Sequence, residues 1–223
     1  MSSRRTPTPN ASVTLACPAC QLAFAAQLAL TWEIAGKDSD FCPQYTGDNP
    51  MPAFLNVCPS CGFVGFEADY RLTVEEERLS ALRTALRSFG FTRGQMLGGA
   101  ERYRRAAVLA VYLGKSNADI ANLYLQATWC SRLEGEDDSI ETRARRKAVT
   151  YFEKALAAGE IADPDLPVVY YLLSELYRRL GKTAAARQAL AQFRQFPDVE
   201  GWLQVMSTHL SLSLGHDDRP SVD

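Results

Sequence analysis

Two cysteine pairs of the same form, Cys17-Pro-Ala-Cys20 and Cys58-Pro-Ser-Cys61, constrain the fold of this chain more than any other feature. A Cys-Pro-x-Cys turn aims two thiolates at one point, and two such turns supply the four sulfur ligands of a tetrahedral zinc site. A site with four protein ligands leaves no position open for substrate, so its role is to stabilise the fold. The sequence therefore predicts a structural Zn²⁺ bound by Cys17, Cys20, Cys58 and Cys61.

Redox chemistry is the alternative reading of these pairs, because Cys-Pro-x-Cys also occurs in thioredoxin-like sites, where the first thiol lies at a helix N-terminus. Here apolar and polar residues alternate over residues 22–32, which is a strand pattern, and residues 54–58 and 62–70 also read as short strands. A zinc ribbon fits this arrangement better. The turn after Cys61 continues with Gly62, whereas Gln21 takes the equivalent place after Cys20 and predicts a less favourable turn.

The composition favours a reduced, cytoplasmic protein. Five of the six cysteines precede residue 62, and the sequence start has no apolar core typical of a signal peptide. Thiols in such a protein bind metal more often than they form disulfides. No apolar run approaches the roughly 20 residues of a membrane span. The net charge of −2 gives no general attraction to nucleic acid or anionic lipid.

The cysteine pairs are farther apart than in a typical zinc ribbon, so an insertion separates them. Its polar part, residues 37–50, reads KDSDFCPQYTGDNP. In one interpretation, Asp38 and Asp40 bond to nearby backbone amides and Cys42 is partly buried. In the other, Asp38, Asp40, Cys42 and Tyr45 form an additional ligand or loop site. We favour the first and expect the loop to be ordered against the ribbon or the first helix.

From residue 73 the sequence becomes helical. Thr73 and Glu76 have the spacing of a capping box, and glycines separate the segments that follow. The helices are predicted at residues 73–90, 100–113, 117–133, 139–158, 166–180, 183–196 and 198–214. The fold class is therefore α+β. A zinc-ribbon-like module with an inserted loop covers residues 11–70, an α-helical tetratricopeptide-like body covers 73–214, and residues 1–10 and 215–223 are expected to be disordered tails.

The helices show signs of a repeat. Leu-Gly-Lys occurs at residues 113–115 and 180–182, an offset near twice the tetratricopeptide period of ~34 residues. Residues 166–196 match that repeat best, and the acidic segment after residue 133 is expected to lengthen the turn of the preceding pair. Stacked helix pairs expose a concave face. Candidate partner-binding residues on that face are Tyr124, Arg132, Tyr171, Arg178 and Arg179.

These arginines suit an extended acidic peptide, because a guanidinium can bind a carboxylate bidentately. The competing interpretation is that the aromatic residues pack between repeats and the arginines lie on a solvated helix face.

The cysteine pairs, the 37–50 segment and the stretch YYLLSELYRRLGK together resemble the bacterial family of domain of unknown function 2225. The resemblance covers about residues 13–196. It implies a cytosolic bacterial protein with four metal-ligand cysteines, tetratricopeptide-like helices and no known activity. The Asp-x-Asp-Phe motif of the family corresponds to Asp38, Asp40 and Phe41.

The sequence favours a non-catalytic zinc-binding adapter that binds a protein or peptide partner. The chain has two histidines, His209 and His216, and neither belongs to a zinc or catalytic-triad signature. One alternative is an enzyme or small-ligand binder that uses the 38–45 loop. Another is a nucleic-acid-binding zinc ribbon, although the residues around the second cysteine pair are not basic. The sequence does not determine an oligomeric state.

Overall fold

The computed structural model describes residues 11–28 and 31–216. Strands and one short helix come first: β1 (Ala11–Ala16), β2 (Ala23–Leu28), β3 (Ile34–Lys37), β4 (Pro43–Tyr45), α1 (Met51–Phe54), β5 (Asn56–Val57) and β6 (Val64–Gly65). A 3₁₀ helix, Glu67–Arg71, leads to the helical body. The body contains α2 (Glu76–Ser88), α3 (Gly99–Tyr112), α4 (Asn117–Glu134), α5 (Asp138–Ala157), α6 (Leu166–Arg179), α7 (Thr183–Phe193) and α8 (Gly201–His216).

The strands form three antiparallel hairpins, β1–β2, β3–β4 and β5–β6. The first cysteine pair lies in the turn between β1 and β2, and the second lies between β5 and β6. The β3–β4 hairpin is the insertion between them. The expected α+β fold, with a small cysteine-containing β module before a helical body, is confirmed.

Part of the strand prediction over residues 62–70 is wrong. Only Val64–Gly65 is a strand, and the chain then turns into the 3₁₀ helix. The Asp69 carboxylate accepts the Phe66 N–H at 2.9 Å, which closes that turn. The Tyr70 hydroxyl hydrogen-bonds the carbonyls of Asn56 and Phe63, so the 3₁₀ helix fastens both strands of the β5–β6 hairpin.

The helices begin and end within a few residues of their predicted limits. The predicted capping box at Thr73 is wrong, because α2 begins at Glu76 after the N-cap residue Glu75, and no side-chain bond caps it. The expected long turn between α4 and α5 is also wrong. Gly135 ends α4 with φ of 68°, and the Asp137 side chain accepts the Ser139 N–H, so α5 starts at once.

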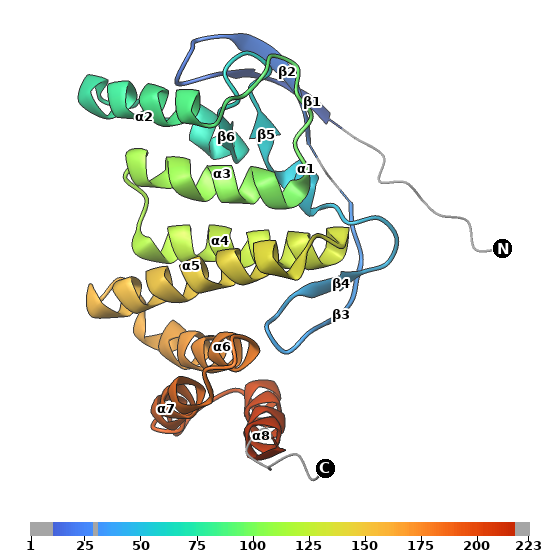
Figure 1. The fold of residues 1–223 in the computed structure, drawn as a ribbon, viewed down its shortest axis with the longest axis vertical. Coiled ribbons are helices and arrows are strands. Elements are labelled where there is room, and N and C mark those ends of the chain that lie inside the picture. Colours follow the sequence, from blue (N-terminus) through green and yellow to red (C-terminus); the bar gives the residue numbers. More distant parts are fainter. Residues whose placement is uncertain (1–10, 29–30, 217–223) are drawn as a thin grey trace, which may run out of the picture.

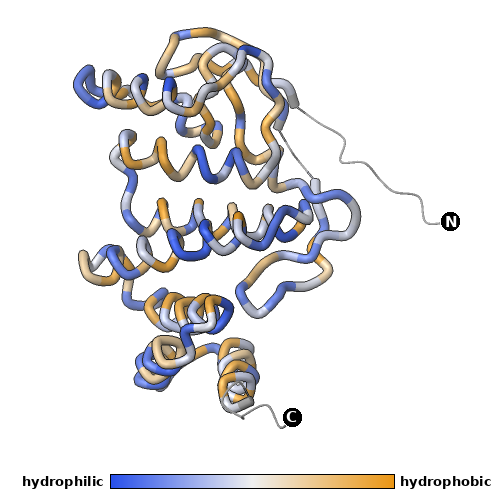
Figure 2. Tube along the Cα trace, viewed as in Figure 1, coloured by the Kyte–Doolittle hydropathy of each residue, from blue (hydrophilic) through white to orange (hydrophobic). Residues whose placement is uncertain are grey.

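The helices stack in chain order along the long axis, from α2 beside the cysteine module to α8 at the opposite end (Figure 1). Small residues, including Ala121, Ala127 and Ala148, are fully buried and allow close helix packing. Hydrophobic and hydrophilic positions alternate along most helices (Figure 2), and the largest apolar cluster runs from α1 into α7. None of the described helices is both long and apolar enough to cross a membrane.

The predicted disordered tails, 1–10 and 215–223, lie outside the described residues, apart from Gly215 and His216 at the end of α8. The 11–70 and 73–214 boundaries remain a prediction.

Candidate metal centre and loop-binding site

The four cysteines predicted to bind metal lie together at the tips of two hairpins. The Sγ atoms of Cys17, Cys20, Cys58 and Cys61 are all within 4.8 Å of one another, and none forms a disulfide. The Cys17–Cys61 and Cys20–Cys58 Sγ distances are both 3.6 Å. A tetrahedron with metal–sulfur bonds of ~2.3 Å has edges of about 3.8 Å. The cluster therefore has the size of a tetrahedral four-sulfur metal site.

Both cysteine turns have the same backbone geometry. The N–H of the first cysteine donates to the carbonyl five residues later, at 2.9 Å for Cys17 and 2.8 Å for Cys58. The carbonyl of the first cysteine accepts the N–H four residues later, from Gln21 at 2.8 Å and from Gly62 at 3.0 Å. Those two residues have φ of 63° and 73°. The two turns therefore present their thiols in equivalent orientations.

The thiols of the cluster influence one another. Hydrogen bonding with Cys17 lowers the pKa of Cys58, and the same interaction raises the pKa of Cys17. A bound cation would take the place of the thiol protons and hold the sulfurs as thiolates.

Arginines of α2 border this cluster. Arg83 Nε donates to the carbonyl of Ala19 at 2.9 Å, and Arg83 and Arg87 line a cavity of about 530 Å³ together with Cys20 and Cys61. Four thiolates around a divalent cation carry a net charge of −2. The guanidinium groups of Arg83 and Arg87 lie on the same cavity as Cys20 and Cys61 and would favour such a negatively charged site.

The left-handed backbone at Gln21 gives a first testable expectation. Gln21→Gly removes the steric cost of holding a residue with a side chain at positive φ. Two effects oppose this gain: glycine loses more backbone entropy on folding, and the 3.2 Å hydrogen bond from the Gln21 side chain to the Pro18 carbonyl is lost. We therefore expect the variant to be more stable than wild type by only about 0.5 kcal/mol. Urea denaturation of the metal-loaded protein measures it. The matched change, Gly62→Ala, should destabilise by about 1–3 kcal/mol, because its Cβ would lie 2.4 Å from Phe91 Cγ. A Gln21→Gly variant less stable than wild type would contradict this account.

The inserted loop lies away from the cysteine cluster. The expectation that it packs on the ribbon or the first helix is wrong, because the β3–β4 turn contacts α4 and α6. Arg132 of α4 binds the Asp40 carboxylate bidentately, with Nη2–Oδ2 at 2.6 Å and Nη1–Oδ1 at 3.1 Å. Nη1 also lies 3.0 Å from Asp38 Oδ2. The Asp40 side chain is 0% exposed.

Groups on α6 complete the contact. The Tyr171 hydroxyl donates to the Ser39 carbonyl at 2.8 Å, and the Ser39 hydroxyl donates to Glu175 at 2.7 Å. Arg179 Nη2 donates to Ser39 Oγ at 3.0 Å and lies 3.7 Å from Asp40 Oδ1. We name Asp38, Ser39, Asp40, Arg132 and Arg179 the clasp.

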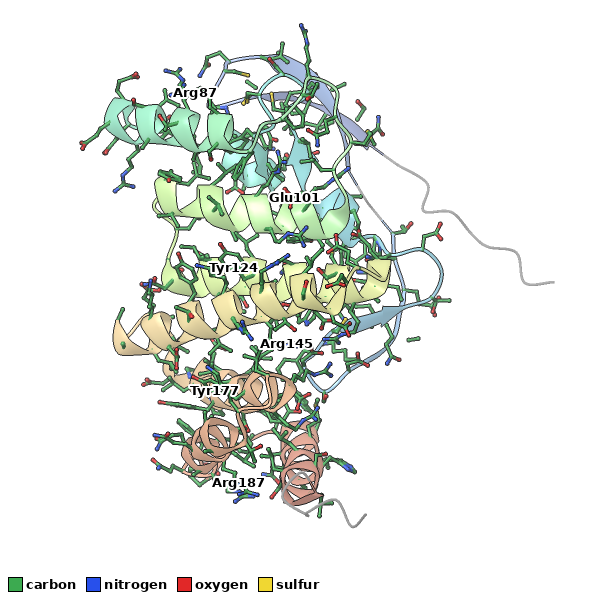
Figure 3. The ribbon with its side chains drawn as sticks, viewed as in Figure 1. Arg87, Glu101, Tyr124, Arg145, Tyr177 and Arg187 are labelled. Atoms are coloured by element: carbon green, nitrogen blue, oxygen red, sulfur yellow. The ribbon has the colours of Figure 1, made fainter. Side chains whose placement is uncertain are left out.

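Charges alternate through the clasp and behind it. Glu141 of α5 lies 3.0 Å from Arg132 and pairs with Arg145, which projects between α5 and α6 (Figure 3). Burial disfavours the ionised form of Asp40, but the hydrogen bond from Arg132 and the charge of Arg179 outweigh it and lower the pKa of Asp40. The clasp is thus an ionised network and not a protonated carboxyl site.

An aromatic contact fixes the next residue of the loop. Phe41 adopts φ of 65°, and its ring lies 5.4 Å from Tyr171 and 5.8 Å from Trp202 of α8, measured between centroids. The Asp38 N–H and the Cys42 carbonyl hydrogen-bond at 2.9 Å, which closes the hairpin turn. Residues 38–41 are therefore held by ion pairs, by backbone hydrogen bonds and by aromatic contacts of Phe41.

Of the other predicted loop residues, Cys42 is buried at the base of this hairpin and Tyr45 is partly buried there. Cys42 is 1% exposed and does not belong to the cysteine cluster. Burial raises the pKa of Cys42 and of Tyr45 to about 12. Asp40 is also buried and ion-paired, whereas the side chain of Asp38 is 33% exposed.

The structure brings together four of the five predicted partner-binding residues. Tyr171, Arg132 and Arg179 hold the loop, and Arg178 Nε donates to Glu175 at 2.8 Å. Tyr124 instead stacks on Tyr151 at 5.7 Å.

The sequence interpretation missed Ser39, Glu141, Arg145 and Glu175. The ion pairs of Glu175 could have been predicted from the sequence. Glu175 precedes Arg178 by three residues and Arg179 by four, which is the spacing of ion pairs along a helix.

These two sites define a helical protein whose N-terminal module carries a four-cysteine cluster capable of holding a metal ion. Residues 11–206 match the family model DUF2225, described as "Uncharacterized protein conserved in bacteria". The chain belongs to this family. Comparisons with curated proteins and with solved structures gave no match.

Proposed function

We propose that this protein is a non-catalytic zinc-binding adapter of the bacterial cytoplasm, with zinc as a structural ion and a tetratricopeptide-like body as its binding element. The cysteine cluster supports the first part, because four sulfurs within 4.8 Å fill the coordination sphere of tetrahedral zinc. A closed site of this kind stabilises the β module and leaves no position for a reacting water. Binding is then the task of the helices.

The observation that carries the proposal is the loop in the clasp. Residues 38–41 form an acidic turn, and this turn lies on the basic residues of α4 and α6 that were expected to bind an acidic peptide. The carboxylates of Asp38 and Asp40 bind the guanidinium of Arg132. The Ser39 carbonyl accepts a hydrogen bond from the Tyr171 hydroxyl, and the ring of Phe41 contacts the Tyr171 ring. We infer that the partner offers an Asp-x-Asp-aromatic segment that exchanges with the loop.

Exchange has an energetic requirement. A tethered loop competes at an effective concentration on the order of millimolar. A partner segment must therefore bind more tightly than the loop, or gain additional contacts on the helices. The loop therefore prevents weakly acidic sequences from binding to the clasp residues of α4 and α6.

The test releases the loop from the clasp by mutation and then adds the same loop sequence as a separate peptide. The Asp38→Asn/Asp40→Asn double variant should release the loop, because it removes both charges that Arg132 holds. A fluorescent peptide with the sequence of residues 37–45 should then bind, as measured by anisotropy. A peptide with Asn at both acidic positions should bind at least about tenfold more weakly.

Adding Arg132→Gln to the opened variant provides the matched control. It leaves the loop released but removes the bidentate donor, so peptide binding should be lost. Equal binding of both peptides, or binding that survives Arg132→Gln, would show that the clasp residues do not select an acidic segment.

A further inference from the structure

The last helix, α8, is apolar on two sides. It contains no Asp, Glu, Lys or Arg from Gly201 to His216. Leu203, Leu210 and Leu214 are 2–4% exposed and pack with side chains of α6 and α7. On the other side, the large apolar residues are exposed: Trp202 by 48%, Val205 by 57% and Leu212 by 60%.

The exposed residues form one line. Trp202, Val205, His209 and Leu212 follow one another at spacings of three, four and three residues, the pattern of a helix-pairing seam. At 3.6 residues per turn they fall within an arc of about 80°, on the side away from the buried leucines. We name these four residues the outer stripe.

The chemistry of the outer stripe limits what can cover it. The outermost helix of a stacked array ordinarily presents a polar face, whereas three of the four residues in the outer stripe are large and apolar. Helices that lie on lipid carry Lys or Arg beside their apolar face, and α8 carries neither. A charged peptide would find no opposite charge on the helix. The occupant that fits is another uncharged apolar helix.

We propose that the outer stripe pairs with the outer stripe of a second copy of this chain, in an antiparallel, two-fold symmetric contact. The stripe is self-complementary in that orientation. Trp202 faces Leu212 of the partner subunit, Val205 faces His209 of the partner subunit, and the two-fold axis repeats both contacts.

The expected interface is small. A helix of 16 residues is about 24 Å long, and one helix pair buries on the order of 1,000 Å², near the lower limit for a specific interface. We therefore expect a reversible dimer with a dissociation constant on the order of micromolar. Trp202 supplies a large aromatic contact near each end of the pair, and its ring already packs on Phe41.

Sedimentation velocity of the full chain over a range of concentrations tests the proposal. Wild type should convert from monomer to dimer, and Val205→Glu or Leu212→Glu should raise the dissociation constant at least about thirtyfold. Gln204→Glu is the control, because it adds the same charge to the same helix at an exposed position outside the stripe. A wild-type protein that stays monomeric at hundreds of micromolar, or equal weakening by Gln204→Glu, would overturn the proposal.

Crosslinking tests the orientation. In the antiparallel register, the Val205→Cys/His209→Cys variant should form disulfide-linked dimers under mild oxidation, and Leu212→Cys alone should give no more than wild type. Strong linkage by Leu212→Cys alone would indicate a parallel pair and contradict the proposed register.

Discussion

Cys58→Ser is expected to abolish zinc binding and to unfold the N-terminal module. Two-stranded hairpins are at best marginally stable in isolation, and Cys58 is fully buried in the apolar cluster that joins the module to α2. Structural zinc contributes an apparent ~10–16 kcal/mol at neutral pH, as much as the whole stability of a typical domain. Elemental analysis should give about one zinc per wild-type chain and almost none for the variant.

Cys42→Ser and Cys130→Ser are the matched controls. Both thiols are buried and neither belongs to the four-cysteine cluster: Cys130 lies in the apolar cluster of the helices, and Cys42 lies in the β3–β4 hairpin. We expect each to keep its zinc, at the cost of a modest packing loss. Amide exchange should place the unfolding caused by Cys58→Ser in residues 11–28, 56–71 and α2, while α4–α7 stay protected. Zinc retained by Cys58→Ser and lost by Cys42→Ser would mean that the ligand set is wrong.

The cysteine cluster was predictable because residues close together in the sequence determine the shape of each cysteine turn. Each pair lies within four residues, and the turn that joins two thiols follows from Pro and from a residue with positive φ at the fifth position. The helix limits were predictable for a similar reason, since Gly114, Gly135 and Gly181 all end helices with positive φ. In these places a few neighbouring residues determine the backbone.

The clasp was not predictable in the same way. Asp40 and Arg132 are 92 positions apart, and neither residue shows in its own neighbourhood that it has a partner. An arginine on a helix next to polar residues usually lies on a solvated face, and an Asp in a polar loop usually bonds the backbone. Asp40 does accept the Cys42 N–H at 3.3 Å, as the local pattern indicates. Its burial against α4 and α6 depends on how the whole insertion crosses the helical body.

Asp40→Asn is expected to destabilise the protein by about 2–3 kcal/mol, because it removes the charge from a buried carboxylate that accepts two charge-assisted hydrogen bonds from Arg132, while Arg132 keeps Asp38 and Glu141 as anionic partners. Asp40 is 0% exposed, and the side chains of Arg132 and Arg179 are 23% and 21% exposed. Urea denaturation measures the change, and amide exchange in residues 38–45 should increase. Asp48→Asn, an exposed change in the same insertion, should alter stability by less than about 0.5 kcal/mol.

The acid dependence of stability gives a second measurement of the same carboxylate. Because the folded protein lowers the pKa of Asp40, the stability that this group contributes is fully present above the unfolded pKa of about 3.9 and is lost as the pH falls through the lower folded value. Glu175, whose pKa is also lowered despite burial by bonds from Arg178, Ser39 and Arg179, contributes in the same direction. Asp40→Asn should therefore lose part of the acid dependence below about pH 4.

A double-mutant cycle separates the ion pair from a general packing defect. Arg132→Gln alone should be strongly destabilising, because it leaves Asp40 buried with Arg179 as its remaining cation in the clasp. If the two residues act mainly on each other, Asp40→Asn/Arg132→Gln should cost less than the sum of the single changes, with a coupling energy above about 1 kcal/mol. Additive losses would mean that Asp40 is held by backbone and aromatic contacts of the hairpin, and that the guanidinium of Arg132 acts chiefly on Asp38 and Glu141.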